Sequence, residues 1–272
     1  YSAEQQPSSL HGTQVALVLA GKHDGLGNIT GIAPDVHVYS AGAGRSGLIS
    51  QEAAVNAWED LTRQGVGIIN NSFGSDGLQS YKEEAERYYA SSKKETTLIG
   101  RMKQVIDAGA LLIFASGNEG YTHPTDYPLY PLAEPELAKG LIAVTGTYGG
   151  QDISPNANRC GDAKNWCLAA NYDVYIAPAN AKAGTDISNA ALDRVSGTSS
   201  AAPQVSGAAA LVKQKYPWMS NDNLRTTLLT TATDLGAKGV DSVYGWGLLN
   251  IGKAVNGPAQ FAFGDFNANV TG

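Results

Sequence analysis

Short apolar runs alternate along this chain with longer segments in which apolar and polar positions recur at helical spacing. An apolar run of about four to eight residues is typical of a buried strand. The expected strands cover Val36 to Ser40, Val66 to Asn71, Leu111 to Ala115, Leu141 to Thr145 and Val174 to Ala177. The expected helices cover Gln51 to Gln64, Leu98 to Ala108 and Asn221 to Thr230. This alternation predicts an α/β fold with a central, mainly parallel sheet and helices on both of its faces.

Two further helices are expected to begin beside residues that could do chemistry. An apolar helical pattern follows His11, and a helix rich in small residues follows Ser199. The free N–H groups and the positive dipole end of a helix N-terminus favour negative charge beside them, and acyl transfer develops such charge. Ser199 is therefore either a nucleophile or an ordinary N-cap, since Ser and Thr are preferred N-cap residues.

Two other segments favour the chemical interpretation. His11 has an imidazole whose ordinary pKa lies near neutrality, which suits a general base. The apolar run Leu111 to Ala115 ends just before Gly117-Asn118, and an Asn amide at a strand end can donate to an oxyanion. Alone, the histidine could be structural and the asparagine could make a turn. Together with Ser199 they predict a serine hydrolase, although the Gly-x-Ser-x-Gly elbow of α/β-hydrolases does not occur in the chain.

These segments resemble the subtilisin-like serine peptidases. The resemblance rests on three boxes and two flanking motifs: His11-Gly12-Thr13, Gly117-Asn118, Gly197 to Pro203, Gly31-Ile32-Ala33-Pro34 and Ile68 to Gly74. It covers nearly the whole chain and implies one catalytic domain over residues 1–272 with a three-layer fold. It also implies that Ser199 attacks the scissile carbonyl, that His11 moves the proton and that Asn118 holds the oxyanion.

The same resemblance implies where a protein or peptide substrate binds. The expected substrate-binding residues are Ser72, Phe73, Gly74, Ala115, Ser116 and Gly117. The segment Gly42 to Gly47 is expected to flank an extended peptide as an added strand. No cofactor is required by this chemistry. Calcium is common in the family, but no acidic loop here has a spacing that assigns a calcium site, so no metal ligands are predicted.

One part of the family pattern is missing. The subtilisin order is Asp, then His, then Ser, but only ten residues precede His11 and Glu4 is the one acid among them. Asp24 and Asp35 follow His11 and are not assigned to the triad. Losing the orienting carboxylate costs about 10⁴-fold in rate. We therefore expect a preceding segment that carries the triad aspartate on a strand of the sheet.

The missing aspartate keeps a second class of function open. The chain could be a non-catalytic, subtilase-shaped binding module or an inactive fragment, whereas the intact histidine, asparagine and serine boxes favour an enzyme. Hydrophobic residues make up 43% and charged residues 16% of the chain, which argues against disorder. The net charge of −6 gives no reason to expect nucleic acid as a partner. No apolar run approaches the roughly 18 residues of a membrane-spanning helix.

The two cysteines, Cys160 and Cys167, are separated by six residues. A metal site would need more Cys or His ligands than the nearest, His123. Two buried free thiols remain an alternative, but a disulfide fits a short loop of an extracellular protein better. The surrounding sequence and the ending Gly245 to Asn250 resemble autotransporter-type subtilases of Gram-negative bacteria. That resemblance implies a passenger at the cell surface or outside the cell, exported across the outer membrane with the help of a C-terminal β-barrel translocator.

The stretch from residue 75 to residue 97 departs from the compact family pattern. It contains a polar helical run, Tyr81 to Tyr89. A solvated surface insertion explains it well, because long loop insertions cost little. A lid or exosite beside the substrate is the alternative interpretation.

Overall fold

The computed structural model describes residues 10–22, 30–42, 44–45, 48–75, 77–180, 192–257, 261–263 and 266–268. Its main sheet contains four parallel strands in the order β3, β4, β5, β7, with β6 antiparallel to the end of β5. Their bounds are β3 Ile68–Asn71, β4 Leu111–Ala115, β5 Leu141–Tyr148, β6 Asp152–Ile153 and β7 Cys167–Asn171. The predicted mainly parallel sheet is confirmed.

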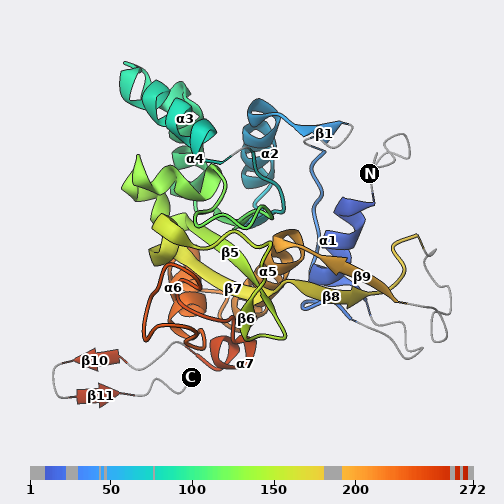
Figure 1. The fold of residues 1–272 in the computed structure, drawn as a ribbon. Helices are drawn as coiled ribbons and strands as arrows, with labels where there is room; N and C mark the ends of the chain where they lie inside the picture. The colour runs from blue at the N-terminus through green and yellow to red at the C-terminus, as the bar shows by residue number, and fades with distance from the viewer. Residues whose placement is uncertain are drawn as a thin grey trace.

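Helices cover both faces of this sheet (Figure 1). One face carries α2 Gln51–Arg63, α3 Leu78–Ala90 and α4 Leu98–Asp107, and the other carries α5 Thr198–Lys215, α6 Asn221–Thr230 and α7 Ile251–Val255. Short 3₁₀ helices lie in the connections between these elements: η1 Lys94–Thr96 between α3 and α4, η2 Tyr127–Leu132 and η3 Pro135–Gly140 between β4 and β5, and η4 Gly161–Trp166 between β6 and β7. Strand β4 shows why its sequence is an unbroken apolar run. Leu112 and Phe114 pack on the first face, and Leu111, Ile113 and Ala115 pack on the second.

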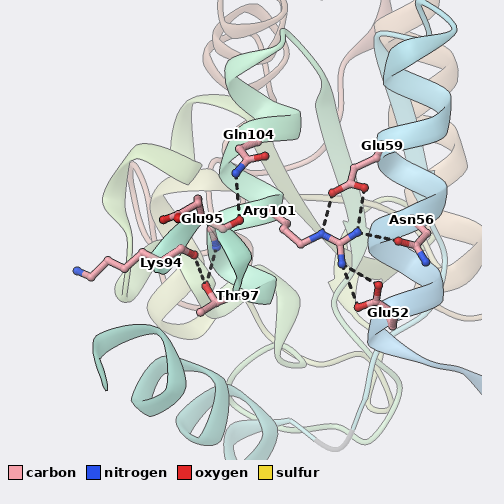
Figure 2. Close-up of polar contacts among 9 residues, drawn as sticks. Glu52, Asn56, Glu59, Lys94, Glu95, Thr97, Arg101 and Gln104 are labelled. Atoms are coloured by element: carbon pink, nitrogen blue, oxygen red, sulfur yellow. Dashed lines mark hydrogen bonds and ion pairs between the residues drawn. The ribbon is translucent and has the colours of Figure 1, made fainter. Parts of the chain in front are cut away.

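Helix α2 is joined to the end of β3 and to α4. Trp58 of α2 packs edge-on against Phe114 at 5.7 Å and donates its indole N–H to Oδ1 of buried Asn71 at 2.7 Å. Its other link is ionic: Arg101 of α4 reaches across to α2 (Figure 2). The guanidinium donates to both carboxylate oxygens of Glu59, at 2.8 and 2.9 Å.

The same guanidinium also contacts Glu52 at 2.9 Å and Asn56 at 2.7 Å. Arg101 is 19% exposed and Glu59 32%, so their pair is partly shielded from water, whereas Glu52 is 71% exposed. The hydrogen bonds from Arg101 lower the pKa of Glu59. Helix α4 therefore holds α2 with a fixed, forked contact.

One expected strand does not form, and another forms outside the main sheet. Val36 to Ser40 forms no strand, and Val38 and Tyr39 are more than half exposed. An apolar segment becomes a strand only where a neighbour hydrogen-bonds to it, and no described strand pairs with this one. Strand β8 (Asp173–Ile176) exists but lies outside the main sheet, because it pairs antiparallel with β9 (Asp193–Ser196).

Three smaller features complete the described fold. Two further hairpins pair β1 Gly44–Arg45 with β2 Leu48–Ile49, and β10 Phe261–Phe263 with β11 Phe266–Ala268. A disulfide joins Cys160 to Cys167, so the alternative of two free thiols is wrong. The polar helical run between residues 75 and 97 forms α3, which lies at the periphery in Figure 1 and buries Glu84, Ala85 and Tyr88.

Candidate active site

Ser199 is the second residue of α5 and does not cap the helix. The N-cap is Gly197, whose φ of +135° favours glycine and which has no side chain that could cap the helix. The backbone N–H of Gly197 donates to Tyr172 O at 3.0 Å. Ser199 Oγ lies 3.4 Å from Ser72 O, and Ser72 Oγ donates back to Ser199 O at 2.9 Å. The alternative of Ser199 as an ordinary N-cap is therefore wrong.

The small residues of α5 let α1 (His11–Ala20) pack closely against it. A Cβ atom added at Gly207 would lie 2.6 Å from Cβ of Ile32 and 3.4 Å from Leu19 O. The segment that contains Ile32 is itself bonded to α1: Ile32 N donates to Val18 O at 3.1 Å and Ala33 N to Leu19 O at 2.8 Å. These contacts fix the helix that begins with the histidine against the helix that carries the serine.

His11 and Ser199 line one pocket of about 210 Å³. Its lining residues are His11, Gln14, Val15, Arg194, Val195, Ser196, Ser199 and Ser200. His11 is exposed at the surface overall, but the protein atoms around its ring exclude part of the water and lower the pKa of His11 below 6.5. None of these lining residues is acidic, while Arg194 is paired with Asp173 at 2.8 Å. Neutral His11 can accept a proton near pH 7.

Asn118 lies beside the first turn of α5. Its Oδ1 accepts from the backbone N–H of Thr198 at 2.8 Å and from the Thr198 hydroxyl at 3.1 Å. A Cβ atom added at Gly197 would lie 3.6 Å from Asn118 Nδ2 and 3.6 Å from Ser199 N. The amide oxygen is therefore occupied by Thr198, while the amide nitrogen of this exposed residue and the backbone nitrogen of Ser199 both lie near Gly197. Donors of these two kinds can bind an oxyanion.

The expected substrate-binding segments leave the sheet side by side. Ser72-Phe73-Gly74 follows β3, and Ala115-Ser116-Gly117 ends and follows β4, the parallel neighbour of β3. The last paired residues, Asn71 and Phe114, lie opposite one another. The structure thus brings both segments to the carboxyl edge of the sheet, where Ser199 also lies through its contacts with Ser72.

Some side chains of these segments point elsewhere. Phe73 packs edge-on against Tyr127 at 5.7 Å in the core, and fully buried Ser116 donates its hydroxyl to Asn158 O at 2.8 Å. The side chains of Phe73 and Ser116 are therefore engaged inside the protein, which leaves their backbones at this edge of the sheet. Cβ atoms added at Gly74 and Gly117 would lie 2.5 and 2.8 Å from atoms of Thr125, so that side chain fills the space between the two glycines.

Asp126, which belongs to none of the sequence motifs, bonds to the end of the segment that follows β3. Asp126 is fully buried, and its carboxylate accepts from the Ser75 hydroxyl at 2.5 Å, from Ser75 N at 3.2 Å and from the Tyr130 hydroxyl at 3.3 Å. Burial raises the pKa of Asp126, while its hydrogen-bond donors act in the opposite direction. The only signal in the sequence is an acid directly before the aromatic and proline-rich stretch Tyr127 to Leu132.

Asp35, one of the aspartates considered from the sequence, is exposed and does not line the pocket of His11 and Ser199. Asp24 lies outside the described residues, as does part of the segment Gly42 to Gly47. Within the described ranges, no group of three or more His, Cys, Asp or Glu side chains could hold a metal ion. None of the helices described is long and apolar enough to cross a membrane.

Residues 2–247 match a family model described as the subtilase family. The neisserial autotransporter lipoprotein NalP of Neisseria meningitidis serogroup B (strain H44/76) is 39% identical over 89% of this chain and 25% of its own length. Serotype-specific antigen 1 of Mannheimia haemolytica is 38% identical over 74% of this chain and 22% of its own. An extracellular serine protease of Serratia marcescens is 30% identical over 92% of this chain and 28% of its own. The chain thus spans about a quarter of the length of these relatives.

Two solved structures have similar folds. The prenylagaramide maturation protease PagA superposes with a TM-score of 0.67, at 27% identity over 90% of this chain and 81% of its own. MycP1 with its N-terminal propeptide removed gives a TM-score of 0.69, at 21% identity over 92% of this chain and 80% of its own.

Proposed function

This chain belongs to the subtilase family, and from that membership we propose that it is the catalytic domain of a secreted, subtilisin-like serine endopeptidase that cleaves protein or peptide substrates. One observation carries the proposal. Ser199 and His11 line the same pocket, and Asn118 is bonded to the first turn of the helix that bears Ser199. The alternative of a non-catalytic binding module is not favoured, because a relative over most of the chain is named an extracellular serine protease.

The mechanism follows from these positions. Ser199 Oγ attacks the scissile carbonyl carbon while neutral His11 accepts its proton, and the carbonyl oxygen takes the displaced electron pair. The resulting oxyanion accepts hydrogen bonds from Asn118 Nδ2 and from the backbone N–H of Ser199. When the tetrahedral intermediate collapses, the C–N bond breaks and His11 protonates the leaving amine. Water then repeats the sequence on the acyl-enzyme and frees Ser199. No step uses a metal or a cofactor.

The substrate lies beside the two segments that leave the carboxyl edge of the sheet. The backbones of Ser72 to Gly74 and of Ala115 to Gly117 are placed to bond an extended peptide by strand addition. Backbone contacts of this kind hold many sequences equally well. Discrimination between substrates therefore depends on the side-chain pockets next to the scissile bond.

The carboxylate that orients His11 comes from a segment preceding the described residues. Two observations support this part of the proposal: no described residue lining the pocket is acidic, and β3 is hydrogen-bonded on its β4 side alone among the described strands. A strand added at the free side of β3 would satisfy its backbone groups, each of which costs roughly 1–3 kcal/mol when buried without a partner. Intact-mass and N-terminal sequence analysis of the protein purified from its native source tests this. A species that matches Tyr1–Gly272 alone, with no companion peptide and full activity, would exclude it.

Labelling with a fluorophosphonate probe tests the enzymatic function. The protein expressed from its complete gene should be labelled, and peptide mapping should place the adduct on Ser199. Ser199→Ala is the matched variant and should not be labelled. Ser200→Ala, which changes the neighbouring serine of the same helix, should keep the label on Ser199. A folded protein that neither reacts with the probe nor cleaves any peptide in a mixed library would contradict the proposal.

The relatives also suggest the cellular location. An autotransporter lipoprotein and an extracellular serine protease match over most of this chain, which supports a secreted or cell-surface protein. We extend this to export across the outer membrane with a C-terminal translocator as partner. Fractionation of cells that express the complete gene should recover this domain from the medium or from the outer surface, where added trypsin can reach it.

A further inference from the structure

Asn158 is a fully buried polar residue that the mechanism does not use. Its side chain makes four hydrogen bonds. Oδ1 accepts from the backbone N–H of Glu119 at 3.0 Å and of Tyr121 at 2.9 Å. Nδ2 donates to Ser116 O at 3.1 Å and to Glu119 Oε2 at 2.7 Å. Every donor and acceptor position of this amide is therefore directed into the loop of residues 116–121, which contains Asn118.

The backbone of Asn158 extends the same contact. Its N–H donates to Gly117 O at 3.0 Å, and its carbonyl accepts from the Ser116 hydroxyl at 2.8 Å. The carbonyl also accepts from the hydroxyl of Thr145 at 2.7 Å, and Thr145 is a fully buried residue of β5. Asn158 thus connects the loop to a central strand of the sheet.

The loop of residues 116–121 depends on these contacts because it forms no helix or strand of its own. Gly117 and Gly120 both have positive φ, at +110° and +72°, on either side of Asn118. Asn118 N–H donates to Glu119 Oε2 at 2.9 Å, and that carboxylate oxygen is the one held by Asn158 Nδ2. Asn158 therefore reaches Asn118 from both sides, through Gly117 and through Glu119.

We infer that Asn158 is a positioning residue for the oxyanion donor, which it holds at the distance from Ser199 that acyl transfer requires. This inference rests on the proposed serine endopeptidase function. Only an amide of this length supplies two acceptor and two donor positions at one point. A carboxylate would lose both donors and place a like charge beside Glu119, and an aliphatic side chain would remove the acceptor from the backbone N–H groups of Glu119 and Tyr121.

Kinetics of two variants test the inference in the protein expressed from its complete gene, with a peptide p-nitroanilide that the wild-type protein cleaves. A displacement of 1 Å can cost about 10²-fold in rate, so Asn158→Asp should lower kcat by about 10²-fold and leave KM within about threefold. Exposed Glu119 provides one of the two hydrogen-bonded connections between Asn158 and Asn118. We therefore expect a fall in kcat of about tenfold or less for Glu119→Ala. Because Glu119 is at the surface, this variant keeps the test valid even where Asn158→Asp fails to fold.

The decisive measurement repeats both substitutions in an Asn118→Ala background. A residue that acts by positioning Asn118 should lose its effect on kcat once that amide is gone, leaving changes below about twofold. Binding of a peptide aldehyde, whose hemiacetal oxygen occupies the oxyanion site, should weaken in parallel with kcat in the Asn118-containing proteins. The same fold-loss of kcat in both backgrounds would overturn the inference, as would unchanged kcat in folded Asn158→Asp.

Asn221→Asp is the matched control. Asn221 Nδ2 also donates to two backbone carbonyls, Gly67 O at 2.6 Å and Gly109 O, but at the opposite end of the same parallel strands. This variant should lower the melting temperature and leave kcat unchanged. A wild-type protein that cleaves nothing would refute the proposed function itself, whereas an active wild type with insensitive Asn158 variants would refute only the role of Asn158.

Discussion

Replacing Arg101 by Met tests whether the forked contact between α4 and α2 contributes to stability. Methionine keeps an apolar stem but removes the guanidinium, so that the hydrogen bonds to Glu59, Asn56 and Glu52 are all lost. Hydrogen bonds to charged groups are worth about 1.5–3 kcal/mol net when partly shielded, which applies to the pair with Glu59. The pair with exposed Glu52 adds about 0–1 kcal/mol.

The expected loss in the free energy of unfolding is therefore about 2–4 kcal/mol. For 272 residues that corresponds to a fall in melting temperature of roughly 4–7 °C. Differential scanning calorimetry of the protein expressed from its complete gene measures it. A double-mutant cycle with Glu59→Leu should give a coupling energy of about 1–2 kcal/mol, because most of the effect belongs to this pair.

Arg63→Met is the control, since Arg63 also forms an ion pair on α2, with Asp60, but both partners are more than half exposed. It should cost less than about 1 kcal/mol. The pH dependence of the free energy of unfolding gives a second measurement. Because Arg101 lowers the pKa of Glu59 below its ordinary value of 4.5, this stabilisation is fully present above pH 4.5 and is lost as the pH falls through the lowered value. Equal losses for Arg101→Met and Arg63→Met, or a coupling energy near zero, would refute the reasoning.

Three further substitutions test other parts of the fold. Trp58→Phe leaves the buried Oδ1 of Asn71 without its donor, so we expect a loss of about 1–3 kcal/mol in chemical denaturation; a wild-type midpoint would contradict this. Replacing Cys160 and Cys167 together by Ser opens a loop of about eight residues and should cost about 2.5 kcal/mol relative to the disulfide-bonded wild type in urea unfolding; the reduced wild type should match the variant, and a variant as stable as the disulfide-bonded protein would contradict this. Gly207→Val should slow fluorophosphonate labelling by about 10²-fold, because the added side chain pushes α1 away from α5; labelling at the wild-type rate would show that this contact is dispensable.

The spacing and length of the apolar segments predicted the strands that are buried on both faces and the helices that bury one stripe of side chains. Leu111 to Ala115 and Asn221 to Thr230 match β4 and α6. The sequence could not predict that Val36 to Ser40 forms no strand, because pairing depends on a neighbour rather than on the segment itself. Likewise, nothing local to Val174 to Ala177 shows that its partner is β9 rather than the main sheet.

The residues of the candidate site also differ in whether the sequence alone predicts them. Boxes of glycine and small residues around His11, Asn118 and Ser199 could be found because each sits where an element begins or ends. Asn158 and Asp126 could not, because a buried polar residue is identified by the groups it bonds, and those groups are distant in the sequence. The contacts of Asn158 and Asp126 exist only in the folded chain.

The close contact between α1 and α5 has a consequence for laboratory evolution. The helix that begins at His11 packs against the helix that carries Ser199 at a point away from both residues, where Gly207 meets Ile32 without room for a Cβ atom. Mutational tolerance along α5 should therefore be uneven, with the least tolerant position at Gly207, eight residues beyond Ser199, and more tolerant positions near the exposed end of the helix. If the proposed function holds, libraries aimed at new cleavage preferences would retain more active members when they leave this contact unchanged and vary the loops after β3 and β4, whose changes need not alter the spacing of His11 and Ser199.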